Sequence, residues 1–123
     1  MATFVITGDM LRLHLSAWER AAAFHGDITV PLRAVTGVEV DDNPFGSLRG
    51  MRAPGTGIPG VIAYGTRRYR GGRDFAAILA RRPAVRVDLD PALSPFSRIT
   101  VSAPDPEHVV RQISSQSRPD ANR

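Results

Sequence analysis

The chain of 123 residues contains no cysteine and no lysine. Without cysteine, disulfide bonds, thiolate nucleophiles and cysteine-based zinc sites are all excluded. This agrees with a reducing compartment, so we expect a cytoplasmic protein. Without lysine, the whole basic charge of the chain rests on its 16 arginines.

Long hydrophobic runs are also missing. No apolar stretch approaches the roughly 20 residues that a membrane-spanning helix needs, and residues 1–10 have neither the basic nor the apolar region of a signal peptide. We therefore expect no transmembrane segment, with peripheral attachment to a membrane as an alternative to a purely cytoplasmic location. The length fits one domain, which we place at residues 1–114, followed by a flexible tail at residues 115–123.

The charges of the chain are unevenly distributed. Residues 49–86 hold nine arginines and one acid, Asp74, whereas the rest of the chain holds seven arginines and eleven acids. A basic middle between acidic flanks indicates an anionic partner. The alternative is that these side chains only solvate the exposed faces of strands.

Alternation of apolar and polar residues predicts short strands along most of the chain. The first two strands form a hairpin that turns at Gly8-Asp9. A short helix follows, because Ser16 and Glu19 have the spacing of a capping box. Gly71-Gly72 predicts a second tight hairpin. The other predicted strands are residues 28–32, 38–40, 61–69, 73–79, 85–89 and 99–101.

Residues 41–59 show neither a strand nor a helix period. They contain four glycines and three prolines, together with apolar residues that a free linker would not need. Long irregular segments in small domains are commonly functional or disordered. We interpret this segment as a packed loop with some apolar side chains tucked beneath it.

The C-terminal part predicts one amphipathic helix. Asp105 is a good N-cap residue and Pro106 suits the first helical position, while Val109, Val110 and Ile113 share one face. Consecutive strands without long helices between them indicate antiparallel pairing. The sequence therefore predicts a mainly β protein, a split β-barrel of about seven antiparallel strands that the C-terminal α-helix closes.

This order of elements resembles the pleckstrin-homology-like (PH-like) fold, and the sequence is similar to small actinobacterial proteins of unknown function with a bacterial PH-like domain. The likeness spans roughly residues 3–113. PH-like domains include phosphoinositide binders, peptide binders and scaffolds, so the resemblance implies a fold and no single activity. The basic hairpin of lipid-binding PH domains has no counterpart here, because the Gly8-Asp9 turn holds no arginine. The residues that carry the likeness are Ile28 to Val40, Leu48 to Gly60, Gly65-Thr66, Asp74-Phe75, Arg82 to Leu89 and Asp105-Pro106-Glu107.

Motifs for cofactor, metal or catalytic chemistry are weak. Residues 55–60 fit the glycine spacing of a dinucleotide loop, but no strand is predicted before them and no helix after them. The three histidines do not form a metal-binding pair, and no nucleophile elbow is present. We therefore expect no catalytic residue, no metal and no cofactor, and a small enzyme without a recognisable motif stays the least favoured reading.

Two surfaces are candidates for binding. The first is the segment 41–59, whose aromatic, methionine and arginine residues are typical of interfaces with an unknown protein partner or a second copy of the chain: Phe45, Leu48, Arg49, Met51 and Arg52. The alternative is that its apolar side chains are ordinary core. The second surface is an arginine-rich hairpin that would bind phosphate, acidic lipid or nucleic acid: Arg67, Arg68, Arg70 and Arg73.

Overall fold

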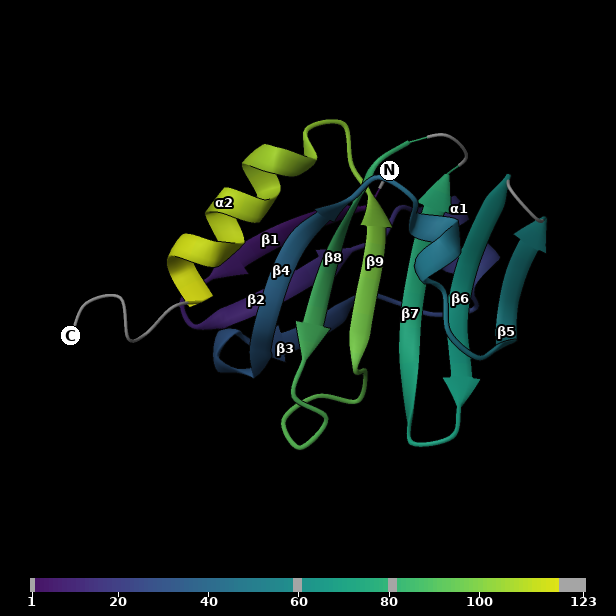
Figure 1. Cartoon of the computed structure of the whole chain (residues 1–123), viewed down its shortest axis with the longest axis horizontal. Helices are drawn as coiled ribbons and strands as arrows, with labels where there is room; N and C mark the ends of the chain where they lie inside the picture. The colour runs from purple at the N-terminus through teal and green to yellow at the C-terminus, as the bar shows by residue number, and fades with distance from the viewer. Residues whose placement is uncertain (1, 59–60, 80–81, 118–123) are drawn as a thin grey trace.

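The computed structural model describes residues 2–58, 61–79 and 82–117, and gives only the backbone for residue 47 and residues 51–54. Two sheets form the body of the protein (Figure 1). The smaller sheet has the order β1-β2-β3, from Thr3–Thr7, Met10–His14 and Ile28–Pro31. The larger sheet has the order β4-β8-β9-β7-β6-β5. Its strands are β4 Val35–Asp41, β5 Met51–Ile58, β6 Ile62–Tyr69, β7 Gly72–Leu79, β8 Ala84–Leu89 and β9 Arg98–Ser102.

Two α-helices and two short 3-10 helices complete the described part. Helix α1, Ala17–Ala23, follows β2, and helix α2, Pro106–Ser117, follows β9. The 3-10 helices are η1, Leu32–Ala34, and η2, Pro44–Ser47. The predicted hairpin at Gly8-Asp9, the capping box of α1 and the cap of α2 are all confirmed, the last by the His108 N–H that donates to Asp105 Oδ1.

The main core lies between the two sheets, whose strands cross each other in Figure 1. Leu11 and Leu13 of β2 face Val85 and Val87 of β8 across it, and Ile113 of α2 is buried in the same cluster. A second, smaller core lies on the other face of the large sheet, where Ala76 and Ile78 of β7 meet residues around η2. Burial on both faces explains the continuous apolar run of β7, because such a strand has no solvent side.

The expectation of an antiparallel split barrel is wrong in two respects. Within the described residues the sheets contain nine strands and do not close into a barrel, and β9 pairs in parallel with β7 over Asp74–Ala77 and Arg98–Val101. The reason is that β9 folds back from β8 and inserts between β8 and β7, so the order in space differs from the order in sequence. The coarser expectation is confirmed, since the fold is mainly β with one C-terminal helix.

The interpretation of residues 41–59 as a loop is also wrong. This segment contains η2 and the eight-residue strand β5, which pairs with β6. A register shift between Arg52 and Gly55 removes the period of two that marks a strand in sequence. Gly55 has φ +154 and lies against the backbone of Tyr64, so a side chain does not fit there. Proline and glycine are tolerated because β5 is an edge strand.

Candidate functional site

Helix α1 is fixed against the large sheet by a buried carboxylate. Glu19 has no exposed surface, and its Oε1 accepts hydrogen bonds from the N–H and the hydroxyl of Ser16 at 3.1 and 2.9 Å. Its Oε2 accepts the hydroxyl of Tyr64 on β6 at 3.1 Å. Burial, with the charge of Glu19 added to it, raises the pKa of Tyr64 far above its usual value, so the phenol stays a proton donor. Glu19, the acidic residue of the α1 capping box, thus also links the helix to the large sheet.

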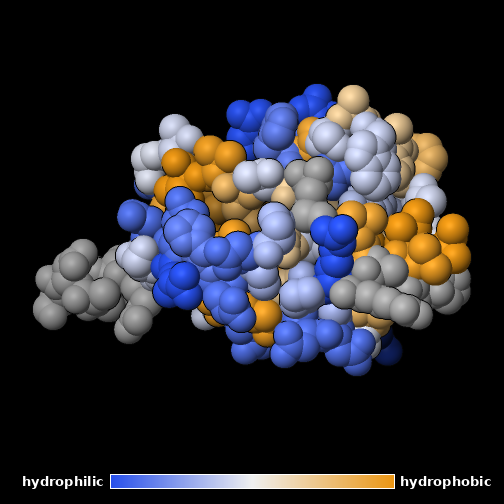
Figure 2. Space-filling view, turned by 90° about the horizontal axis from the view of Figure 1, so that it is seen from above, coloured by the Kyte–Doolittle hydropathy of each residue, from blue (hydrophilic) through white to orange (hydrophobic). Residues whose placement is uncertain are grey.

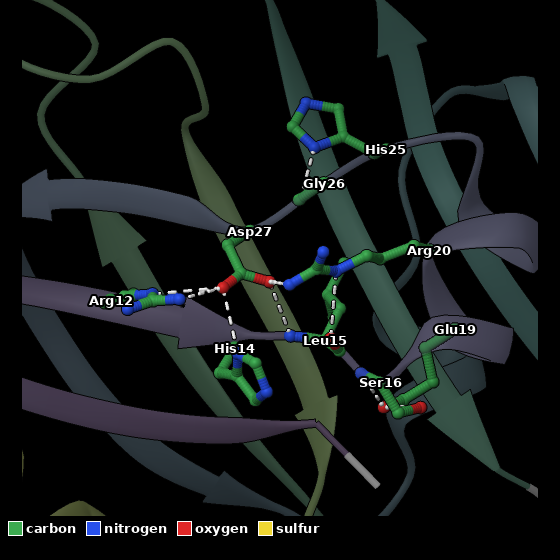
Figure 3. Close-up of polar contacts among 9 residues, drawn as sticks. All are labelled: Arg12, His14, Leu15, Ser16, Glu19, Arg20, His25, Gly26 and Asp27. Carbon is green, nitrogen blue, oxygen red and sulfur yellow. Dashed lines mark hydrogen bonds and ion pairs between the residues drawn. The ribbon is translucent and has the colours of Figure 1, made fainter.

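A second carboxylate holds the other side of α1 (Figure 3). Asp27, just before β3, accepts hydrogen bonds from the Leu15 N–H at 2.9 Å, from Arg20 of α1 at 3.1 Å and from Arg12 Nε at 3.0 Å. His14 Nδ1 lies 2.9 Å from the same carboxylate. The Leu15 N–H, the two arginines and His14 hold the pKa of Asp27 far below its ordinary value of 3.8. This cluster joins β2, α1 and β3 and leaves α1 little freedom to move.

The histidine nearest Asp27 in sequence does not join the cluster. His25 Nδ1 donates to the Gly26 carbonyl at 2.7 Å, and its ring lies edge-on to Phe75 and Phe96, each with ring centroids 5.6 Å away. His14 lies beside Asp27 instead. The reason is the register of β2 and β3: Arg12 is opposite Thr29, so His14 at the end of β2 is level with Asp27, which precedes β3. The proximity of His14 and Asp27 depends on this register, which the sequence alone does not reveal.

Exposed apolar side chains gather around α1 and the end of the β5–β6 hairpin. The described residues include six large hydrophobic side chains that are exposed, and four of them lie here: Trp18 at 50%, Phe24 at 65%, Ile58 at 53% and Val61 at 46%. We call these four residues the α1–β5 surface. Figure 2 shows hydrophobic surface at this end of the molecule.

Contacts between α1 and the sheet place Trp18 beside the β5–β6 hairpin, where the Val61 N–H donates to the Ile58 carbonyl at 2.8 Å, and Phe24 directly follows the helix. The ring of Trp18 lies 5.0 Å from that of Tyr64 on β6, and Tyr64 is opposite Thr56 of β5. The Thr56 hydroxyl donates to the Ala22 carbonyl at 2.7 Å, near the end of α1. Ile58 is two residues beyond Thr56, so both lie on the face of β5 that α1 covers. None of these four residues was predicted from the sequence to belong to a binding surface.

The predicted partner surface at residues 45–52 serves the protein's own packing where it is described. Phe45 and Leu48 are partly buried against Ala63, Ala76 and Ile78 in the second core. Arg49 forms a two-pronged ion pair with Asp74, with Nε to Oδ2 at 2.7 Å and Nη2 to Oδ1 at 2.9 Å. This pairing raises the pKa of Arg49. The side chains of Met51 and Arg52 lie outside the described residues.

The four arginines of the predicted anion site do not converge. Arg67 is opposite Asp74, while Arg68 is opposite Arg73, so strand alternation puts Arg67 and Arg68 on opposite faces of the sheet. Arg67 donates to the carbonyls of Arg49 and Gly50 at 3.1 and 2.7 Å. The guanidinium of Arg73 lies 5.4 Å from the centre of the Phe96 ring. Arg70 is exposed in the two-residue loop between Tyr69 and Gly72, one residue earlier than the turn expected at Gly71-Gly72.

Among the described residues, no cluster of three or more His, Asp or Glu side chains could hold a metal ion. No described helix has the length and apolar character needed to cross a membrane. A shallow groove between β1 and α2 is lined mainly by apolar residues, among them Phe4, Ala103 and Val109. Phe4 and Val109 pack on the main core, so this groove is the outer side of that core.

Comparison with known proteins adds no relative: no family model, no curated protein and no solved structure matches this chain.

Replacing Asp27 by Asn tests the cluster that holds α1. We expect the free energy of unfolding to fall by about 1–3 kcal/mol near neutral pH, because Asn cannot accept the charged hydrogen bonds. The folded pKa of Asp27 is depressed, so its stabilisation is complete well above 3.8, begins to decline as the pH falls below that value, and is fully lost only below the folded pKa. Urea unfolding of both proteins between about pH 7 and pH 3 measures this. A gap between the two proteins that stays constant down to the lowest pH would contradict the role of the charge.

Replacing Arg49 by Ala tests whether this arginine is structural. The Asp74 side chain is 5% exposed and would keep only the Tyr69 hydroxyl, 3.0 Å away, among the contacts described here. We expect a loss of about 2 kcal/mol or more in the free energy of unfolding. The matched control is Arg70→Ala on the exposed turn, which should change stability by less than about 0.5 kcal/mol. Equal effects of the two variants would show that the ion pair contributes nothing.

Proposed function

We propose that the chain is a non-enzymatic interaction module that binds a protein partner or a second copy of itself through the α1–β5 surface. The observation that carries this proposal is the gathering of Trp18, Phe24, Ile58 and Val61, each 46–65% exposed, on one region. Isolated exposed hydrophobic residues are ordinary, but apolar side chains that gather beside polar ones mark interaction sites. Tryptophan and other aromatic residues are also enriched at the centres of interfaces.

The backbone at Phe24 gives this proposal independent support. Phe24 is the C-cap of α1 and has φ +53, and it is the one described residue other than glycine with positive φ. Glycine or asparagine adopts this conformation at lower cost, whereas a bulky side chain there is strained. The chain thus keeps an aromatic residue that is both strained and 65% exposed. Strain of this kind tends to persist where a side chain has a function.

The proposal includes the likeness to PH-like domains and a cytoplasmic setting. The order of many strands followed by one C-terminal helix supports the likeness, and the absence of cysteine supports the setting. The parallel pair β7–β9 and the open sheets depart from the barrel that the likeness implies. Binding of phosphate, lipid or nucleic acid at residues 67–73 is the weaker alternative, because Arg67 and Arg68 lie on opposite faces of the sheet.

The variant Phe24→Gly separates stability from binding. Removing the strained side chain should raise the free energy of unfolding by up to about 1 kcal/mol, because glycine suits the left-handed conformation. The same variant should lose self-association in analytical ultracentrifugation, or lose a stoichiometric partner captured from lysate, whichever the wild-type protein shows. Ile58→Ser should weaken the same association without acting through the helix end.

The control for both variants is Leu93→Ser, at an exposed hydrophobic residue outside the α1–β5 surface. Its association should match that of the wild-type protein. If Phe24→Gly and Ile58→Ser associate as the wild type does, or if Leu93→Ser weakens association equally, the α1–β5 surface is not the binding site.

A further inference from the structure

The large sheet has two edges, and only one of them is covered in the described part. Strand β4 forms one edge, and α2 packs beside it over much of its length (Figure 1). Strand β5 forms the other edge, and no described element lies beyond it (Figure 1). An open edge presents backbone N–H and C=O groups that another extended chain can pair with. The open edge of β5 is therefore suited to pairing with an extended segment of another chain.

Charges on the outer face of the large sheet form a row across its strands. Asp88 of β8 lies opposite Arg98 of β9, and Arg98 lies opposite Asp74 of β7. Asp74 in turn lies opposite Arg67 of β6. The sign alternates at each of these steps, and Arg98 Nε lies 2.7 Å from Asp88. At the open edge the alternation ends, because the residue of β5 in register with Arg67 is Arg52. Like charges directly opposite one another are unfavourable, and a carboxylate at the next position would restore the alternation.

The surroundings of this edge are basic as well. Residues 49–74 contain six arginines and a single acid, Asp74, which already receives Arg49 and Tyr69. A basic surface of this kind attracts an acidic segment and speeds its encounter with the protein. The acids on the covered edge, Glu39 and Asp41 of β4, belong to ion pairs with Arg86. A second copy of the chain therefore does not offer an open acidic strand within the described residues.

We propose that β5 accepts an extended, acidic segment of a partner protein as a seventh strand of the large sheet. Residues 55–58, beyond the register shift, provide the regular part of the edge. An apolar side chain of the added strand would lie beside Ile58 on the face that α1 covers. An acidic side chain would lie toward the register position of Arg52, on the opposite face. This inference rests on the proposed interaction function and specifies the chemistry of the partner.

The test uses peptides of about twelve residues, selected from a random library on the purified full-length chain. Selected peptides should combine β-favouring apolar residues in alternation with aspartate or glutamate toward one end. Binding is then measured by fluorescence anisotropy with the synthetic peptides. Methylating the backbone nitrogens of the peptide one at a time should weaken binding at every second position, because only alternate N–H groups of a strand face its neighbour.

Charge reversal on the protein completes the test. Arg52→Glu should weaken peptide binding by about tenfold or more, and exchanging the peptide's acid for arginine should restore it in this variant. The matched control is Arg70→Glu, the same change at an exposed turn outside the row, and it should weaken binding by less than about threefold. Circular dichroism of both variants confirms that they are folded.

Several results would overturn the strand proposal. These are selected peptides without acids, no alternation in the methylation series, equal losses in Arg52→Glu and Arg70→Glu, or a dimer of the chain that occupies β5. Tighter binding of single-stranded RNA than of any selected peptide would make the basic surface a nucleic-acid site. If peptide binding is lost in Phe24→Gly but unchanged in Arg52→Glu, the interaction function stands and only strand addition fails. If no peptide is selected and the wild type does not associate, both proposals fail.

Discussion

The carboxylate of Glu19 determines where α1 lies, and the proposed function depends on that position. A fully buried carboxylate is costly unless hydrogen bonds replace its water. Ser16 supplies two of these bonds from the helix cap, and Tyr64 supplies another from the large sheet. The helix cannot slide along β6 without breaking this set, and Asp27 restrains its other side. Trp18 is therefore held against Tyr64 of β6, and the end of α1, which Phe24 follows, is held at Thr56 of β5.

The basic middle of the chain has a structural role that its composition conceals. Arg49 neutralises the buried Asp74, Arg67 satisfies two backbone carbonyls, and Arg86 pairs with Glu39 and Asp41 of β4. Arginine suits this role because its planar group donates several hydrogen bonds in fixed directions. At the open edge, the row of alternating charges ends at the register position of Arg52. The anionic partner indicated by composition thus becomes, in the proposal, a carboxylate on a strand.

Local signals predicted the elements whose formation is local. Ser16 with Glu19 and Asp105 with Pro106 marked the starts of both α-helices, and the alternation from Val85 to Leu89 marked β8. Strand β5 was missed because its register shift and glycines remove the alternation that identifies a strand. The insertion of β9 beside β7 and the meeting of Arg12, His14 and Arg20 at Asp27 depend on which strands pair. No local pattern contains that information. Phe24, the C-cap of α1, is a bulky residue where glycine or asparagine is usual, and the sequence alone does not show that this position is a helix end.

Hydrogen exchange of the backbone amides tests the central claim most directly, because it reports which edge or surface a bound partner protects. The measurement compares the free chain with the chain bound to the partner or peptide that associates with it. The account predicts added protection at residues 55–58 of β5 and around α1, with β1 and α2 unchanged. Added protection at β1 and α2, or at the hairpin turn around Arg70, with none at β5, would contradict it.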